Sequence, residues 1–301
     1  MNEFQIYSPE EQLHDPLFAE KGIRVFLKRD DMIHPFISGN KWRKLKLNIR
    51  DAKANNRDHL VTFGGVWSNH LLATACAAAK YGLKSTAFVR GEDVNSDVIV
   101  LCRVFGMQLI FTDRSAYRDK KGLYEKKFSH DPSTVFIDEG GAGHLAMQGC
   151  AEIILELGQY YDHLFCAAGT GTTFAGLVKG VTDANLSTTC HCIPALKGAD
   201  FLKEDINAYF DVPPSYSFHD AYSFGGYAKT TPELLRFIRD FTSTTGILLD
   251  PVYTGKMMFA LYALIREDHF PKDSTILAIH TGGLFGLLGM KEQIVTALNQ
   301  N

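Results

Sequence analysis

Short apolar runs alternate with helical patterns from residue 24 almost to the C-terminus. The runs at 60–63 and 85–89 have the length and apolar content of buried strands, whereas 40–54 places apolar residues on one helical stripe. A helix between two strands returns the chain to the same edge of a sheet, so such strands pair in parallel. The sequence therefore predicts an α/β fold with open, largely parallel sheets and flanking helices.

The same periodicities place the remaining elements. Further strands are predicted at 24–27, 108–111, 163–167, 187–193 and 275–279. Further helices are predicted at 69–82, 95–105, 145–158, 173–180, 199–209, 232–243 and 255–267, with a last helix closing the chain. A chain of 301 residues is too long for one simple core, which indicates two sub-domains.

Composition indicates an ordinary water-soluble protein. Hydrophobic content is 46%, charged content is 22%, and the net charge of -3 favours neither nucleic acid nor an anionic membrane as a partner. We see no apolar run of the roughly 18 residues that span a membrane, and no signal peptide. Six scattered cysteines indicate reduced thiols in a cytoplasmic protein. Cys190-His191-Cys192 lacks a second ligand pair, so we expect no metal.

A glycine- and threonine-rich loop, Gly169-Thr170-Gly171-Thr172-Thr173, joins a predicted strand to a predicted helix. Glycines let the backbone approach an anion, and the free N–H groups of a helix N-terminus and the threonine hydroxyls can donate to a phosphate. The loop lacks the Gly-Lys-Ser/Thr of a Walker A motif, and no acidic residue follows the next strand to bind a ribose. A phosphate site is predicted, with a tight strand-to-helix turn as the alternative.

Two other segments are weaker signals. Gly64-Gly65-Val66-Trp67-Ser68-Asn69-His70 also follows a strand and opens a helix, where Ser68 or Asn69 could equally be an N-cap and His70 a structural residue. Lys41, in Ser38-Gly39-Asn40-Lys41-Trp42-Arg43-Lys44, falls in the first turn of a predicted helix. The helix dipole and burial would both lower its pKa and favour a nucleophilic amine. The alternative is one more solvated lysine.

The ordered set of motifs resembles the fold-type II pyridoxal-phosphate enzymes, in particular the 1-aminocyclopropane-1-carboxylate deaminases and D-cysteine desulfhydrases. The resemblance covers residues 24–290. The matching motifs are Lys28-Arg29-Asp30-Asp31, Ser38-Gly39-Asn40-Lys41 with Arg43-Lys44-Leu45, Ser68-Asn69-His70, Glu139-Gly140-Gly141, Tyr253-Thr254-Gly255-Lys256 and His280-Thr281-Gly282-Gly283.

This resemblance implies pyridoxal 5'-phosphate as cofactor and a role for each matching residue. Lys41 would bond the cofactor's aldehyde, Asn69 would bind its phenolic oxygen, and Gly169, Thr170, Gly171, Thr172 and Thr173 would hold its phosphate. Thr281 would lie near the ring nitrogen and Tyr253 against the ring. Ser68 would contact the substrate carboxylate or move a proton, and Tyr227 would line the substrate side. For both tyrosines, ordinary aromatic packing is the alternative.

The resemblance also implies an architecture. It is the tryptophan synthase β-like fold, with two domains of open twisted sheets and the cofactor between them. The large domain would comprise 1–44 plus 146–301 and the small domain 45–145. A homodimer is usual for such enzymes. A neutral hydroxyl near the ring nitrogen stabilises a pyridinium less than a carboxylate does, which favours α,β-elimination over transamination.

Two departures bear on the substrate. The deaminases carry Glu where this chain has Thr254, which puts cyclopropane ring opening in doubt, and Trp67 replaces the usual Gln and would narrow the substrate side. We therefore expect a lyase or deaminase acting on a small amino acid, most simply D-cysteine desulfhydrase-like elimination to pyruvate and ammonia. The alternatives are a 1-aminocyclopropane-1-carboxylate deaminase and a non-catalytic cofactor-binding relative. The Ser-Asn-His turn argues against a cysteine-synthase-like replacement.

Overall fold

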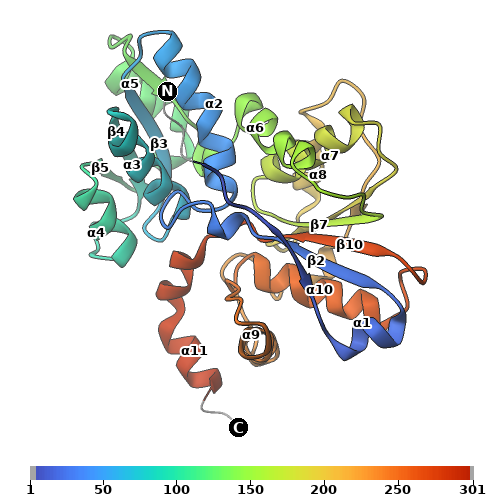
Figure 1. The fold of residues 1–301 in the computed structure, drawn as a ribbon. Coiled ribbons are helices and arrows are strands. Elements are labelled where there is room, and N and C mark those ends of the chain that lie inside the picture. The colour runs from blue at the N-terminus through green and yellow to red at the C-terminus, as the bar shows by residue number, and fades with distance from the viewer. Residues whose placement is uncertain (1–4, 299–301) are drawn as a thin grey trace.

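The computed structural model describes residues 5–298, which form two sheets lying side by side (Figure 1). The larger sheet has six strands in the order β1-β2-β10-β7-β8-β9. Every pairing in it is parallel except that of the edge strand β1 with β2. Its strands are β1 (Glu10–Leu13), β2 (Arg24–Lys28), β7 (His163–Ala168), β8 (Thr189–Pro194), β9 (Ser217–Phe218) and β10 (Thr275–Ile279).

The smaller sheet has four strands, all parallel, in the order β5-β4-β3-β6. They are β3 (His59–Gly65), β4 (Lys84–Arg90), β5 (Gln108–Thr112) and β6 (Thr134–Phe136). The strands of the larger sheet come from both sides of this segment of the chain. The predicted domain boundaries at 44/45 and 145/146 stay a prediction, and helix α2 runs unbroken across the first of them.

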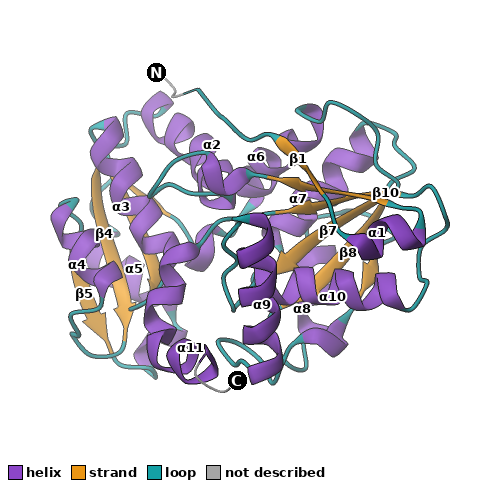
Figure 2. Ribbon diagram, turned by 60° about the horizontal axis from the view of Figure 1, so that its bottom comes forward, coloured by secondary structure: helices purple, strands orange, loops and turns teal. Residues whose placement is uncertain are grey.

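Helices pack on both faces of the larger sheet (Figure 2). Those described are α1 (Pro16–Lys21), α2 (Asn40–Ala54), α3 (Asn69–Tyr81), α4 (Asp97–Val104), α5 (Lys120–Phe128), α6 (His144–Leu155), α7 (Thr172–Asp183), α8 (Asp200–Asn207), α9 (Pro232–Thr245), α10 (Thr254–Arg266) and α11 (Lys291–Leu298), with short 3-10 turns that include η3 (Glu139–Gly141) and η5 (Leu284–Met290). The predicted α/β class with largely parallel sheets is confirmed.

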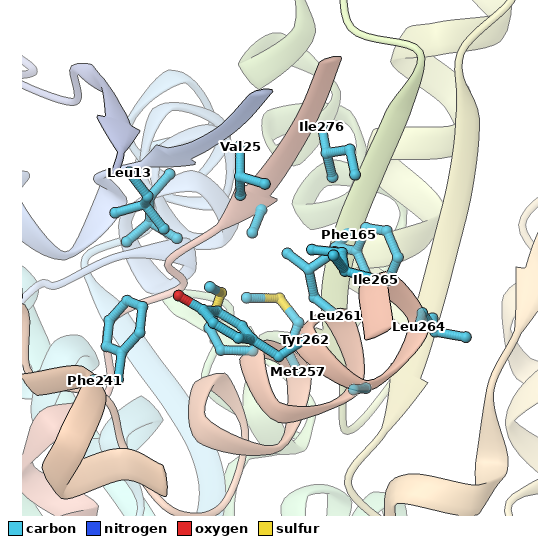
Figure 3. Packing of buried hydrophobic residues seen from close by; sticks show 14 of the residues in the cluster. Leu13, Val25, Phe165, Phe241, Met257, Leu261, Tyr262, Leu264, Ile265 and Ile276 are labelled. Atoms are coloured by element: carbon cyan, nitrogen blue, oxygen red, sulfur yellow. The ribbon is translucent and has the colours of Figure 1, made fainter. Parts of the chain in front are cut away.

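Alternate residues of the larger sheet's strands build two cores. On β7, Phe165 and Ala167 face the cluster formed with α9 and α10, whereas Leu164 and Cys166 face the cluster formed with α6 and α7. Figure 3 shows Phe165 beside Leu261 of α10 in the first cluster. Because both faces are covered, these strands are nearly continuous apolar runs, which is why their periodicity was readable from the sequence.

All six cysteines lie in this interior or in that of the smaller sheet, and none forms a disulfide. Burial raises the pKa of each thiol. The cysteines are thus small buried residues of the core.

Several short elements were not predicted, and some boundaries differ. The missed elements are β1, α1, α5, β6 and β9. Helix α6 ends at Leu155, three residues before the predicted end, because the next residues serve other contacts: Glu156 binds the Arg43 guanidinium and the Gly158 N–H donates to Glu10 at 3.1 Å.

Candidate active site

The loops that follow four parallel strands converge on one cavity. Parallel strands end at the same edge of a sheet, so the segments after β2, β7 and β10 meet there, and the segment after β3 reaches them from the smaller sheet. We call this space the lysine cavity. Its lining includes eight of the predicted site residues: Lys41, Asn69, Gly169, Thr170, Gly171, Thr173, Tyr253 and Thr281.

Lys41 reaches the cavity because α2 starts in contact with the end of β10. Gly39 has φ +61°, and a Cβ there would lie 1.9 Å from the Thr281 carbonyl oxygen, so only glycine fits. The Asn40 N–H donates to that same oxygen at 3.2 Å. This contact fixes the first turn of α2 and therefore the direction in which Lys41 leaves the helix.

The Lys41 amine is unusual among the described lysines. Among residues 5–298, no hydrogen bond or ion pair involves its Nζ atom. Burial, followed by the nearby Lys44 ammonium, lowers its pKa from 10.5 to about 7. A large share of the amine is therefore neutral and nucleophilic near pH 7, as attack on an aldehyde requires.

Lys44 belongs to the same cavity, although the sequence reasoning gave it no role. Its ammonium donates to the Gly140 carbonyl at 3.0 Å and to the Thr170 hydroxyl at 3.3 Å, which holds a positive charge beside the glycine- and threonine-rich loop. The signal was available, because residues three apart lie on one helical face and Lys44 follows Lys41 by three.

The glycine- and threonine-rich loop has the geometry of an anion site. Gly171 has φ +73°, and a Cβ there would meet Ile206 at 2.7 Å. The first turn of α7 leaves N–H groups without partners in the helix, and Gly171, Thr173 and Phe174 at this helix start line the cavity. The Thr173 hydroxyl accepts from Asn40 Nδ2 at 2.9 Å. The Thr172 hydroxyl instead lies 2.9 Å from the Tyr209 hydroxyl, and Thr172 does not line the cavity.

Of the two interpretations of this segment, Ser68 fits the helix N-cap and Asn69 fits the residue that faces the cavity. The Asn69 amide nitrogen donates to the Gly283 carbonyl at 2.9 Å, and its amide oxygen is buried without a partner among the described residues. Ser68 is the N-cap of α3, where its hydroxyl accepts from the Leu71 N–H at 3.4 Å. Ser68 does not line the cavity, and its contact with a substrate stays a prediction.

His70 is structural, as the more ordinary interpretation held. The Thr62 hydroxyl gives its single proton to the Ile137 carbonyl at 2.8 Å, so at 2.7 Å His70 Nε2–H must donate to that hydroxyl. Burial, followed by the charges of Lys41 and Lys44, holds the pKa of this imidazole well below its usual value. His70 is therefore a neutral side chain that links α3 to β3 through its hydrogen bond to Thr62.

Tyr253 forms one wall of the cavity and is positioned by a residue that the sequence reasoning missed. Buried Asp250 accepts the Tyr253 N–H at 2.8 Å and the Thr254 hydroxyl at 2.7 Å, which anchors the start of α10. Gly169 lies against the ring: a Cβ there would be 3.0 Å from it. Thr254 is thus directed at Asp250 and away from the cavity.

Tyr227 and Trp67 lie at the periphery. The Tyr227 ring centroid is 6.2 Å from that of Tyr253, and Tyr227 is 52% exposed and absent from the cavity lining. The Trp67 indole packs against Gly289 of η5, where a Cβ would approach it to 2.7 Å. The structure thus shows the indole in a hydrophobic cluster with the segment after β10.

A half-buried lysine without a partner among the described residues and a glycine- and threonine-rich loop at a helix N-terminus line one cavity of this two-sheet fold. This arrangement is that of a class, the fold-type II pyridoxal-phosphate enzymes. Residues 12–282 match the family described as pyridoxal-phosphate dependent enzyme, and the chain belongs to that family. The predicted cofactor and enzyme class are confirmed.

Individual relatives narrow the resemblance. A Pyrococcus abyssi protein provisionally named 1-aminocyclopropane-1-carboxylate deaminase is 31% identical, over 93% of this chain and 90% of its own. The Arabidopsis thaliana mitochondrial enzyme named bifunctional D-cysteine desulfhydrase/1-aminocyclopropane-1-carboxylate deaminase is 29% identical, over 92% and 76%. A crystal structure of an ACC deaminase homologue superposes with a TM-score of 0.84 at 29% identity, covering 96% of this chain and 93% of that one.

The residues present fit pyridoxal phosphate. The lysine cavity offers a poorly solvated amine for the aldehyde, a helix N-terminus with threonines and Lys44 for the phosphate, and an aromatic wall at Tyr253 for the ring. The unsatisfied Asn69 oxygen marks a place where a further polar group is needed. None of the described residues lining this cavity is acidic.

Proposed function

We propose that this enzyme catalyses α,β-elimination on a small D-amino acid with a leaving group on Cβ, as in a D-cysteine desulfhydrase. The observation that carries the proposal is the unpaired Lys41 amine, with its lowered pKa, in a cavity whose described lining has no carboxylate. Such an amine can bond an aldehyde and then remove an α-proton. A D-cysteine desulfhydrase name among the relatives supports this choice.

We assign the roles from the lining residues. Lys41 would hold the cofactor through its aldehyde carbon until the substrate's amine displaces it, and would then take the proton from the substrate's Cα. The α7 N-terminus, Thr170 and Lys44 hold the phosphate, as their convergence on the loop supports. Asn69 meets the phenolic oxygen. When bound, the cofactor supplies an electron-withdrawing ring for the charge left at Cα.

Thr281 and Tyr253 complete the ring site in this proposal, and Ser68 and Tyr227 serve the substrate side. Thr281 is buried and lines the cavity at the end of β10, which supports its place near the ring nitrogen. The balanced reaction converts D-cysteine and water to pyruvate, ammonia and hydrogen sulfide. The residue at position 254 supports elimination over ring opening, because the Thr254 hydroxyl donates its proton to the Asp250 carboxylate.

A second candidate, 1-aminocyclopropane-1-carboxylate deaminase, is favoured by the names of several relatives. A third is a relative that binds the cofactor without turnover. A screen of ammonia and 2-oxoacid release over D- and L-amino acids and 1-aminocyclopropane-1-carboxylate separates the three. Release of 2-oxobutyrate from the cyclopropane amino acid, with none of pyruvate from D-cysteine, would overturn the elimination proposal.

The lysine assignment has its own test. Lys41→Ala should abolish the visible absorbance of the lysine-bound cofactor and, with it, turnover. Lys53→Ala is the matched control, because Lys53 is on the same helix and exposed. Retention of the absorbance in Lys41→Ala would show that another amine bonds the cofactor.

Assembly and location are part of the same proposal. None of the helices described in residues 5–298 is long and apolar enough to cross a membrane. We propose a homodimer in the cytoplasm, on the resemblance to this family of enzymes. Sedimentation equilibrium of the loaded enzyme tests the dimer, and a monomer at micromolar concentration would contradict it.

A further inference from the structure

A second cavity adjoins the lysine cavity. The two share three lining residues, Lys41, Asn69 and Gly283, so the Lys41 amine stands where they meet. No sequence motif marks this space, because most of its walls come from the 33–38 loop and the segment after β10. We call it the side compartment.

The walls of the side compartment are mainly apolar. Phe36 and Phe285 stack with their ring centroids 5.6 Å apart, and Leu72, Leu284 and Pro35 extend the same surface. Phe36 is held from behind by Phe105, which packs edge-on at 5.2 Å and does not line the compartment. The stacked pair therefore forms a supported wall facing Lys41.

The polar groups of the side compartment offer no free charge. Arg29 binds the Asp31 carboxylate through Nε at 2.9 Å and Nη2 at 2.8 Å, one nitrogen to each oxygen. A cationic group would find both of these oxygens engaged. Lys41 is the sole basic residue among the described lining residues, and its amine must be neutral to take the proton from Cα. A charged group of either sign would therefore lose water here and meet only a carboxylate that is already paired with Arg29.

The chemistry of the proposed function determines what enters this space. The substrate's amino nitrogen would replace the Lys41 amine on the cofactor's aldehyde carbon. The substrate's Cα, bonded to that nitrogen, would then lie beside the released amine, so the groups on Cα would extend into the space that adjoins it. We infer that the side compartment receives the group on the substrate's Cβ, and that this enzyme selects amino acids whose side chain is uncharged and apolar. This inference rests on the proposed elimination and names its substrate class.

The predicted substrates are S-alkylated D-cysteines as well as D-cysteine itself. In the reaction, the Cα–H and Cβ–S bonds break, and the thiolate leaves with the electron pair. Water then supplies the oxygen of the product: S-alkyl-D-cysteine and water give pyruvate, ammonia and the alkanethiol. No oxidant or reductant is needed.

Equilibrium binding tests the selection without turnover. D-leucine and D-aspartate have side chains of the same size and shape but different charge, and neither has a leaving group. We expect calorimetry on the loaded enzyme to give D-leucine roughly 50-fold higher affinity than D-alanine, from about fourfold per buried methylene, and D-aspartate lower affinity than D-alanine. Equal affinities for D-leucine and D-aspartate would overturn the inference.

Variants locate the selection in the side compartment. Leu284→Trp fills the space and should reduce the ratio of D-leucine to D-alanine affinity at least tenfold. Should that variant not fold, Phe285→Leu enlarges the space and should raise the affinity for D-phenylalanine relative to D-leucine. Val104→Ala is the matched control, because Val104 is 74% exposed at the end of α4 and does not line the compartment, and it should leave both ratios unchanged. Unchanged ratios in Leu284→Trp or Phe285→Leu would place the selection elsewhere.

Turnover closes the test. S-isobutyl-D-cysteine should release pyruvate at least tenfold faster than S-carboxymethyl-D-cysteine, which has the same number of non-hydrogen atoms but a negative charge. Equal rates would contradict the inference and leave elimination intact. Loss of the lysine-bound cofactor absorbance, or no pyruvate from any β-substituted amino acid, would instead contradict the proposed function.

Discussion

Two lysines, each near the start of a helix, have opposite surroundings: Lys256 is buried, whereas Lys41 is half-buried beside the lysine cavity. Lys256, in the first turn of α10, donates to the carbonyls of Ser223 and Gly226 at 2.7 Å each and of Ala195 at 3.3 Å. Lys41, in the first turn of α2, has no such partner among the described residues. Burial is the largest cause of a lowered pKa for both, to about 8 for Lys256 and about 7 for Lys41. The Lys256 ammonium thus makes hydrogen bonds that hold loops together, whereas the Lys41 amine remains available for chemistry.

The largest effect should come from removing Lys256. Lys256→Met leaves three carbonyl oxygens without their buried donor, and we expect a loss of about 3–5 kcal/mol in the free energy of unfolding. Denaturant unfolding measures this. Lys197→Met is the control, because Lys197 is exposed and lies against the same Gly226 turn. A loss under about 1 kcal/mol would show that the hydrogen bonds of Lys256 contribute little to stability. Lys256 would then not differ from Lys41 in this respect.

The second effect is the pH dependence that Lys41 adds to the stability of the fold. The folded pKa of about 7 lies below the unfolded value of 10.5, so between these values the unfolded chain binds more protons and stability rises with pH. In the cofactor-free protein, the stability of wild type relative to Lys41→Met should therefore increase from pH 7 to 10.5. We expect the difference in the free energy of unfolding between the two proteins to change by on the order of 2 kcal/mol. This is less than the full pKa shift would give, because solvent in the cavity screens the charge of the amine.

The control for that measurement is Lys53→Met, whose stability relative to wild type should not change with pH. If the relative stability of Lys41→Met stayed flat or fell over the same interval, the Lys41 ammonium would have a favourable partner in the folded protein. The contrast with Lys256 would then be lost.

The smallest effect should come from removing the charge of Lys44. This like charge lies near Lys41 and lowers the pKa of the Lys41 amine. Lys44→Gln should raise the pKa of Lys41 and move the appearance of the neutral amine to higher pH. It should also weaken cofactor binding about tenfold by removing a charged phosphate partner. An absorbance titration with cofactor measures both. Lys46→Gln should change neither, because Lys46 pairs with Glu152 away from the cavity.

The sequence revealed most of the fold because its strands are buried on both faces and its helices are amphipathic. It missed β9, which has two residues, and β1, an antiparallel edge strand whose side chains are mostly polar. α5 carries four lysines in its nine residues and has little apolar face. Such elements are held by tertiary contacts, which no local pattern records.

The site was less completely predictable. The Lys41, Asn69 and Gly169-to-Thr173 segments were expected together, and the structure brings them to one cavity. Asp250 was missed because a buried carboxylate that anchors a helix start resembles any loop aspartate in sequence. The side compartment was missed because a hollow between two loops depends on how they pack.

The buried cysteines have a consequence for an enzyme that would release thiols. Sulfide and alkanethiolates exchange with accessible cysteines and disulfides, and a thiol must be ionised and reachable to take part. All six cysteines here are buried, unpaired and held protonated by their raised pKa values. The enzyme is thereby shielded from its own products. The same property makes it a convenient scaffold, because one cysteine introduced on the surface would be the single site for a maleimide dye.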